Sequence, residues 1–412
     1  MFCYKQNLFL YLEEVLFMVK ALDGILVLDM SRVLSAPFTG MVLADMGADV
    51  IKIEALGHGD DARAYPPYME DESIYFMDLN RGKRSITLNL KSMEGKEILK
   101  KLVKKADVLV ENFRGGTMEK LGLDYTVLKE INPKLIYTQI TGFGRTGPRA
   151  KAPAYDVIVQ GMGGIMSLTG EEGGTPMKVG ISQGDIVAGL YGAIGTAMAL
   201  IAREKTGKGQ LVDISMLDCQ AQFIENAIVR YLNAGVIPKA IGNRHASITP
   251  FQSLPCSDGY IMIAVGNDTL FGKFCDIIER PELKSDERFL TNSLRTQNVK
   301  ALDEILRTIF PNKTCAEWLR LIGESGIPVG PINTVPQVVE DPCLKARDMI
   351  VTLKHSKIGE VKAVNTPIKL SETPGGAEKA APVLGEHTRE VLKEFVGYSD
   401  EKIDELYSTG VV

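Results

Sequence analysis

One uncharged run constrains this chain more than any other feature of its sequence. The 17 residues from Ile186 to Ala202, "IVAGLYGAIGTAMALIA", carry no charge, and a single carboxylate, Asp185, stands directly before them. A run of this length is at the short end of what crosses a bilayer. Its glycines and alanines suit close packing against other backbone, so we expect a buried helix at the centre of a globular protein. Asp is a favoured N-cap residue, so Asp185 is expected to cap this helix.

The composition is that of an ordinary globular protein. Of the 412 residues, 45% are hydrophobic and 24% are charged, which argues against disorder. A net charge of -5 is atypical of nucleic-acid-binding proteins, which usually present a basic face. The six cysteines are scattered, with no Cys-x-x-Cys pair and no metal-ligand spacing. We therefore expect no metal site, and reduced core thiols in a cytoplasmic protein.

The first 17 residues raise a separate question. Their apolar run is broken by Glu13 and Glu14, and no small-residue cleavage site follows, so a signal peptide is not expected. Met18 opens "MVKALDGILVLDM", which would make a natural start. Whether residues 1–17 are native or an over-long start is left open by the sequence.

Strand-like and helix-like patterns alternate from residue 22 onward. The runs "GILVLDM" and "ADVIKIE" are typical of buried strands, and "KSMEGKEILKKLVKKA" places its apolar residues on one helical face. This alternation predicts an α/β fold with a Rossmann-like parallel sheet. No G-x-G-x-x-G follows the first strand, so a dinucleotide fingerprint is absent. Ligands on such sheets usually bind at the carboxyl ends of the strands.

The pattern changes between about residues 221 and 336. Short strand-like segments surround a Ser-Asp-Gly turn, and amphipathic helices follow. We predict a large domain of residues 18–220 plus 337–412 and a smaller α+β domain of residues 221–336.

Physical chemistry allows Asp185 a second role. A carboxylate at a helix N-terminus lies in positive potential and is expected to stay ionised, even in apolar surroundings. Such a poorly hydrated carboxylate can attack an activated acyl group. The backbone amides of residues 160–164, "QGMGG", are candidates to receive the developing oxyanion.

Ordered motifs from Leu22 to the end of the chain carry a resemblance to a known family. They include "SAPFTGMVLADMGADVIKIE", "NRGKRSITLNLK", "DVLVENF", "AYDVIVQGMGG", "GDIVAGLYGAIG" and "EKTGKGQLVDISMLD". With them the chain resembles the family III CoA-transferases, the group that contains formyl-CoA transferase and carnitine CoA-transferase. The resemblance implies that Asp185 is the nucleophile and that CoA moves from an acyl-CoA to a carboxylic acid. The implied intermediates are an aspartyl anhydride and an aspartyl-CoA thioester, and the implied assembly is an interlocked homodimer.

The resemblance also implies which residues bind CoA or the acyl group. It implies no permanently bound cofactor, with CoA and acyl-CoA as substrates beside small carboxylic acids. The acidic charge and the globular composition predict neither a nucleic acid nor a membrane as partner. Formyl-CoA transferase has glutamine at the position of Leu34, so formyl or oxalyl specificity is not favoured here. The implied binding residues are Arg32, Val33, Leu34, Lys91, Asn112, Phe113, Arg114, Lys120 and Tyr155.

Two other functions stay open at this point. The α-methylacyl-CoA racemases are a branch of the same family and share its fold. They use a His in a Gly-His-Asp triplet, where this chain has Ala154, Tyr155 and Asp156. A tyrosine with an ordinary pKa near 10 is a poor base at neutral pH, which favours the transferase. A nucleotide-binding regulatory protein is the third interpretation, and the length of the motif match disfavours it.

Overall fold

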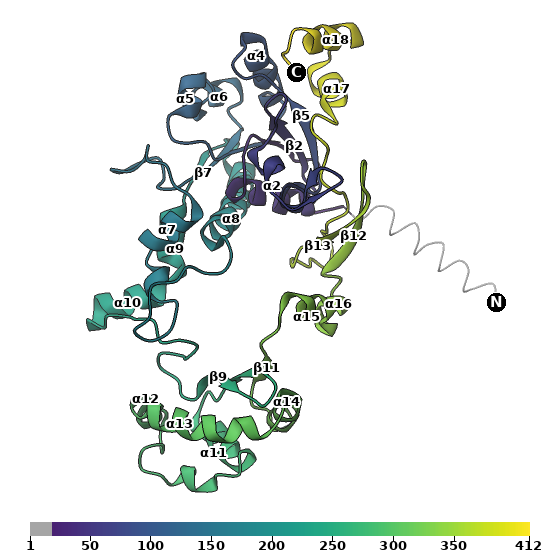
Figure 1. The fold of residues 1–412 in the computed structure, drawn as a ribbon. Coiled ribbons are helices and arrows are strands. Elements are labelled where there is room, and N and C mark those ends of the chain that lie inside the picture. Colours follow the sequence, from purple (N-terminus) through teal and green to yellow (C-terminus); the bar gives the residue numbers. More distant parts are fainter. Residues whose placement is uncertain (1–18) are drawn as a thin grey trace, which may run out of the picture. The chain divides into compact units, whose positions relative to one another are not determined.

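The computed structural model describes residues 19–412 and divides them into two compact units (Figure 1). The large unit comprises the described residues up to Gly164, Val179–Ile228 and Pro342–Val412, and the small unit comprises Ile165–Lys178 and Val229–Asp341. The question about residues 1–17 lies outside the described residues.

The boundaries of these units differ from those predicted at residues 220 and 337. Segment 165–178 belongs to the small unit because it is bonded there: the Gly242 amide donates to the Gly170 carbonyl at 2.9 Å, and Arg244 pairs with Glu172 at 2.8 Å. Residues 221–228 belong to the large unit. The apolar patterns near these boundaries do not reveal which unit supplies the partners.

A six-stranded sheet forms the centre of the large unit. Its order is β5-β2-β1-β6-β7-β8 and every neighbouring pair is parallel, which confirms the predicted α/β class. In the middle of the sheet Leu28 is paired with Ile51 on one side and Leu109 on the other. The strands are β1 (Leu26–Asp29), β2 (Asp49–Glu54), β5 (Lys83–Thr87), β6 (Val108–Glu111), β7 (Ile136–Thr141) and β8 (Leu211–Ser215).

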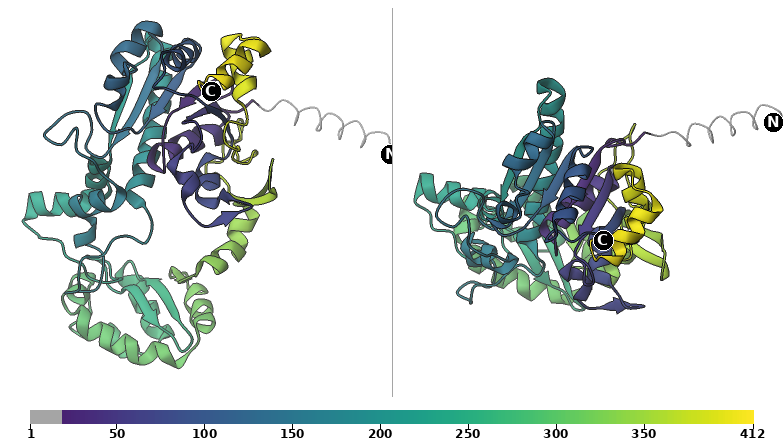
Figure 2. Two further views of the ribbon diagram at one scale, coloured as in Figure 1. Left: turned by 45° about the horizontal axis from the view of Figure 1, so that its top comes forward. Right: turned by 90° about the horizontal axis from the view of Figure 1, so that it is seen from above.

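Helices cover both faces of this sheet, as the continuous apolar strands require. The helix α4 (Met93–Val103) begins at Ser92, whose hydroxyl accepts a bond from the Gly95 amide at 2.9 Å, and buries its predicted apolar face. The C-terminal helices α17 (Thr388–Val391) and α18 (Asp400–Ser408) lie beside the purple and blue strands (Figure 2). The remaining elements are α2 (Ser35–Asp45), η1 (Asp61–Ala64), β3 (Tyr68–Met69), β4 (Glu72–Ser73), α3 (Ile74–Asn80), α5 (Thr117–Leu121), α6 (Tyr125–Ile131), α7 (Asp156–Met162), α8 (Gln183–Thr206), α9 (Met216–Phe223), α10 (Glu225–Ala234, which runs into the small unit), α16 (Pro342–Ala346), β12 (Ile350–His355), β13 (Gly359–Val364) and η5 (Leu392–Val396).

The uncharged run forms most of α8, which is buried on one side only. Its inner side packs closely on α2: a Cβ at Gly189 would lie 2.5 Å from the Ser35 carbonyl oxygen, and one at Gly192 would lie 2.5 Å from the Thr39 hydroxyl. Among residues 19–412, α8 is the one helix with the length and composition of a membrane span, and less than half of its most apolar window is buried. The prediction of a buried helix is therefore confirmed for the inner side of α8 and wrong for its outer side. The exposed outer side consists of Leu190, Tyr191, Ile194, Met198 and Ile201.

The small unit has a separate core. Its three-stranded sheet has the order β11-β10-β9 and is antiparallel. Trp318 joins α14 to η4 in this core, because its ring lies 4.5 Å from that of Phe310 and its indole N–H donates to the Phe310 carbonyl at 2.8 Å. The elements are η2 (Ile165–Ser167), β9 (Phe251–Pro255), β10 (Tyr260–Ala264), α11 (Asp268–Ile277), η3 (Pro281–Lys284), α12 (Asn292–Gln297), α13 (Val299–Ile309), η4 (Phe310–Asn312), α14 (Cys315–Gly323), β11 (Val329–Pro331) and α15 (Val335–Glu340).

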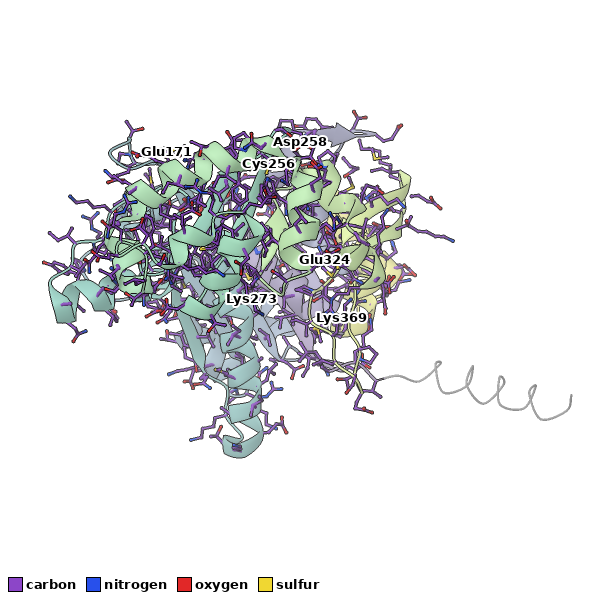
Figure 3. The ribbon with its side chains drawn as sticks, turned by 90° about the horizontal axis from the view of Figure 1, so that it is seen from below. Glu171, Cys256, Asp258, Lys273, Glu324 and Lys369 are labelled. Carbon is purple, nitrogen blue, oxygen red and sulfur yellow. The ribbon has the colours of Figure 1, made fainter. Side chains whose placement is uncertain are left out.

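The cysteines only partly follow the prediction of core thiols. Cys219, Cys256 and Cys275 are buried, whereas Cys315 is half-buried and Cys343 is exposed. Cys256 lies in the turn between β9 and β10, two residues before Asp258 (Figure 3). The three buried cysteines belong to apolar clusters, Cys219 to one in the large unit and Cys256 and Cys275 to the core of the small unit.

Candidate active site

Two adjoining cavities open at the carboxyl ends of the central strands of the large unit. The larger, of about 570 Å³, is lined by segments that follow β1, β2 and β5 and by the start of α5. The smaller, of about 200 Å³, is lined by segments that follow β1, β6 and β7 and by Asp185 of α8. Arg32 and Phe113 line both cavities, so the two are neighbours.

The structure brings together most of the residues predicted to form the site. Lys91 lines the larger cavity with Arg32 and Phe113. Lys120 lines neither cavity, since it lies on the exposed side of α5. The residues around the smaller cavity include Arg32, Val33, Leu34, Asn112, Phe113, Arg114, Tyr155 and Asp185.

The loop between β1 and α2 is fixed by hydrogen bonds to its backbone. The side chain of Asn112 accepts from the Arg32 amide at 2.8 Å and donates to the Arg32 carbonyl at 2.8 Å. Asp60 accepts from the Val33 amide at 2.9 Å. Val33 has φ of 67°, a left-handed conformation that a β-branched residue rarely adopts. Residues held in such conformations gather at functional sites, where the surroundings enforce them.

Two buried ion pairs stabilise this loop and the strand ends beside it. Lys52 contacts Asp60 at 2.9 Å and donates to the carbonyl oxygen of Ser31 at 2.9 Å. Lys83 contacts Asp29 at 2.6 Å, and both side chains are fully buried. Burial lowers the pKa of Lys83 to about 8, against the opposing charge of Asp29. Because removing one partner would leave a buried charge unpaired, these pairs hold the ends of β1 and β2 in one arrangement.

Asp185 lies in the first turn of α8 and does not cap it. The N-cap is Ser182, and Asp185 is the third helical residue. The carboxylate that satisfies the helix start is that of Asp156, which accepts from the Gly184 amide at 2.7 Å and from the Gln160 side chain at 2.8 Å. The prediction that Asp185 is the N-cap is therefore wrong, because a side chain from α7 supplies the acceptor.

The ionisation of Asp185 also differs from expectation. Burial, and then the charge of Asp156, raise the pKa of Asp185 to about 7, while the Ser35 hydroxyl lowers it. A permanently ionised carboxylate was expected from the helix N-terminus. Burial and the negative charge of Asp156 outweigh the positive potential of the helix N-terminus, so this carboxyl group titrates near neutral pH.

Tyrosines border this carboxyl group. Burial, and then the charge of Asp185, raise the pKa of Tyr75 to about 12, so its phenol remains a hydrogen-bond donor. The ring of Tyr65 meets that of Tyr75 edge-on at 5.4 Å. Tyr155 is 75% exposed at the rim of the smaller cavity. Sequence reasoning missed Tyr75 and the role of Asp156, since neither stands in a segment that ends a strand.

The amides proposed to receive an oxyanion are already engaged. Gly163 donates to the Val159 carbonyl at 2.7 Å and Gly164 to that of Gly161 at 3.3 Å, at the end of α7. The Gln160 side chain is buried and donates to Asp156 and to the Ile181 carbonyl. That expectation is therefore wrong, because the glycines end a helix instead of forming an open turn.

Two named enzymes and a solved structure are similar to this chain over most of its length. The human succinyl-CoA:glutarate CoA-transferase is 38% identical over 96% of this chain and 90% of its own length. The acetyl-CoA:oxalate CoA-transferase of Acetobacter aceti is 44% identical over 90% of this chain and 95% of its own. The crystal structure of a CAIB/BAIF family protein from Brucella suis superimposes with a TM-score of 0.83, at 43% identity, and covers 92% of this chain and 100% of that one.

A family model extends this similarity along most of the sequence. The model described as CoA-transferase family III matches residues 22–388, which include every residue that lines the two cavities. The chain therefore belongs to CoA-transferase family III and is an enzyme of the transferase class.

Proposed function

We propose that the protein moves CoA from an acyl-CoA donor to a carboxylic acid acceptor, with Asp185 as the nucleophile. The Asp185 oxygen attacks the thioester carbonyl carbon, the C–S bond breaks, and a mixed anhydride forms as CoA thiolate leaves. The thiolate attacks the aspartyl carbonyl, which releases the donor acid and leaves an aspartyl-CoA thioester. An acceptor carboxylate then attacks the aspartyl carbonyl of this thioester, which gives a second mixed anhydride and frees CoA thiolate. The thiolate attacks the acceptor acyl carbon, the anhydride C–O bond breaks, and acceptor acyl-CoA leaves as the Asp185 carboxylate is restored.

One observation carries this proposal: a partly dehydrated carboxyl group lies in a small cavity that adjoins a larger one. Asp185 lines the 200 Å³ cavity, which suits a short acyl group. The 570 Å³ cavity has apolar walls, such as Ile53 and Leu88, and a lysine, Lys91, at its edge. An elongated ligand with an apolar arm and phosphates matches that combination. The thioester would then lie where Arg32 and Phe113 separate the two cavities.

The state of Asp185 fits a nucleophile that works at neutral pH. With a pKa of about 7, roughly half of the molecules carry the reactive anion at pH 7. A carboxylate with little hydration is more reactive than one in water, because less solvent must be removed in the transition state. The reaction replaces one acyl-CoA thioester by another of similar free energy, so it needs no external energy source and no permanently bound cofactor.

We also propose that the working enzyme is a homodimer in the cytoplasm, with neither a membrane nor a nucleic acid as partner. The outer side of α8 supports the homodimer, since Met198 and Ile201 are 64% and 61% exposed in the single chain. An apolar strip on a helix that carries the nucleophile is typical of a protein interface. Analytical ultracentrifugation tests this assembly, and a monomer at all concentrations would refute it.

Trapping the intermediate tests the catalytic role of Asp185. The enzyme is incubated with acyl-CoAs and treated with hydroxylamine or borohydride, and mass spectrometry is expected to locate the modification on the peptide that holds Asp185. Asp185→Ala should abolish both trapping and CoA exchange. Asp404→Ala, which removes a carboxylate on exposed α18, is the matched control. Rapid α-proton exchange of a 2-methylacyl-CoA without an acceptor acid would favour the racemase instead.

A further inference from the structure

We propose that Arg32 binds the second carboxylate of a dicarboxylic acid or of its CoA ester, and that Asp61 occupies Arg32 when such a ligand is absent. The inference rests on the proposed function of Asp185 and names the substrate class of that site. Arg32, Asp61 and Asp185 all line the 200 Å³ cavity. A short diacid with one carboxyl group at Asp185 would place the other within the same small space.

Of the two cations that line this cavity, Arg32 is held by an exposed carboxylate, which a ligand carboxylate can replace, whereas Arg114 is held by a backbone carbonyl. The lining residues with a positive charge are Arg32 and Arg114. Arg114 is exposed, and its Nε already donates to the Lys151 carbonyl oxygen at 2.7 Å. A planar guanidinium can form two parallel hydrogen bonds with a carboxylate, which suits recognition of a second acid group.

The backbone of Arg32 is fixed, whereas its guanidinium can exchange one carboxylate partner for another. Asn112 holds the amide and the carbonyl of Arg32 at 2.8 Å each, so the backbone cannot drift. The guanidinium meets Asp61 through one nitrogen, and the two side chains are 42% and 43% exposed. The neighbouring pair of Lys52 and Asp60, in contrast, is 0% and 1% exposed. An exposed pair contributes little free energy, so a ligand carboxylate can replace Asp61 at small cost.

Asp61 thus has the chemistry of an internal substitute for the ligand. Its carboxylate neutralises Arg32 in the empty site and keeps the guanidinium turned toward the cavity that both residues line. A monocarboxylic acid has no group to exchange with Asp61 and leaves the pair intact. A dicarboxylic acid competes for the guanidinium. The pair would therefore favour diacids over monoacids of the same chain length.

Acceptor competition in solution tests this selectivity. With acetyl-CoA as donor, kcat/KM is measured for glutarate and for pentanoate, which differ by one carboxyl group. The ratio of the two constants is expected to favour glutarate in the natural protein. Arg32→Gln should lower that ratio about tenfold or more, and Arg32→Lys should lower it less. Asp61→Asn should raise the ratio about two- to fivefold, because the internal competitor is removed.

A matched variant separates recognition from a general change of charge. Arg149→Gln removes the same charge from the large unit, at a side chain that lies over Phe143 and lines neither cavity. It should leave the ratio unchanged. The inference is overturned if Arg32→Gln or Asp61→Asn leaves the ratio unchanged, or if the natural protein prefers pentanoate. Absence of CoA transfer to every acid tried would instead overturn the proposed function. Should Arg32→Gln fail to fold, Arg32→Lys and Asp61→Asn decide between these outcomes.

Discussion

The carboxylate of Asp156 accepts a hydrogen bond of 2.7 Å from the backbone amide of Gly184. A side chain from α7 thereby completes the start of α8, one residue before Asp185. The same carboxylate is the strongest cause, after burial, of the raised pKa of Asp185. Asp156 therefore orders the start of the helix that carries Asp185 and at the same time opposes ionisation of Asp185.

Replacement of Asp156 by asparagine should separate these two effects. The amide oxygen can still accept from Gly184, but the like charge is gone, so the pKa of Asp185 should fall from about 7. We expect the rise of kcat/KM with pH to move to lower pH. Measurement between about pH 5 and pH 9 reports this ionisation in the free enzyme. An unshifted profile in a folded variant would mean that another group controls the reaction.

Asp185→Asn should stabilise the protein at alkaline pH. The pKa of Asp185 is about 7 in the fold and near the ordinary 3.8 in the unfolded chain. As pH rises between these values the unfolded chain ionises first, so the natural protein loses stability until the loss is complete above pH 7. Asparagine has no such dependence. Calorimetry at pH 8 should show a higher Tm for the variant, and the difference should shrink toward pH 4. A constant difference would indicate a packing effect alone.

The two lysines implied to bind CoA should behave differently. Lys91 lines the larger cavity, whereas Lys120 lies outside both. Lys91→Ala should raise KM for acyl-CoA about three- to tenfold with little change in kcat, since an exposed lysine contributes modestly to binding of a phosphate. Lys120→Ala removes the same charge and should change KM less than about twofold. Equal effects from both variants would argue that long-range charge, and no specific contact, attracts the ligand.

Close packing of α8 on α2 should make Gly189 intolerant of substitution. An added Cβ would lie 2.5 Å from the Ser35 carbonyl oxygen and 3.0 Å from the Phe38 Cβ. We expect Gly189→Ala to destabilise the protein by about 1–3 kcal/mol, because α2 must move. Gly180→Ala, where nothing lies within 4 Å, is the control and should stay within about 0.5 kcal/mol. Denaturant unfolding measures both, and a neutral Gly189→Ala would show that the two helices separate easily.

The parallel sheet could be predicted because each strand has its own local signal. β1, β2 and β6 are short apolar runs, and each is followed by polar residues that line the cavities. Arg32 and Asn112 follow β1 and β6 and are bonded to each other, as expected for segments at one edge of a parallel sheet. Lys120 lies outside both cavities on the exposed side of α5, because the rotation of a helix depends on its packing.

The ionisation of Asp185 could not be predicted for a related reason. The pKa of Asp185 is set by burial and by Asp156, a residue on another helix. The left-handed Val33 depends likewise on Asp60, which approaches from the end of β2. A pattern along the chain reports neighbours in sequence, whereas these effects arise between segments that meet only in the folded protein.

If the outer side of α8 is the dimer interface, the activity of the enzyme depends on the concentration of the protein. The first turn of this helix carries Asp185, the proposed nucleophile, and the helix continues with an apolar strip that is exposed to solvent in the single chain. If a second copy seals that strip, synthesis of the polypeptide and completion of the catalyst become two separate events. If the concentration of the polypeptide falls in a cell, its catalytic activity would then fall more steeply than that concentration.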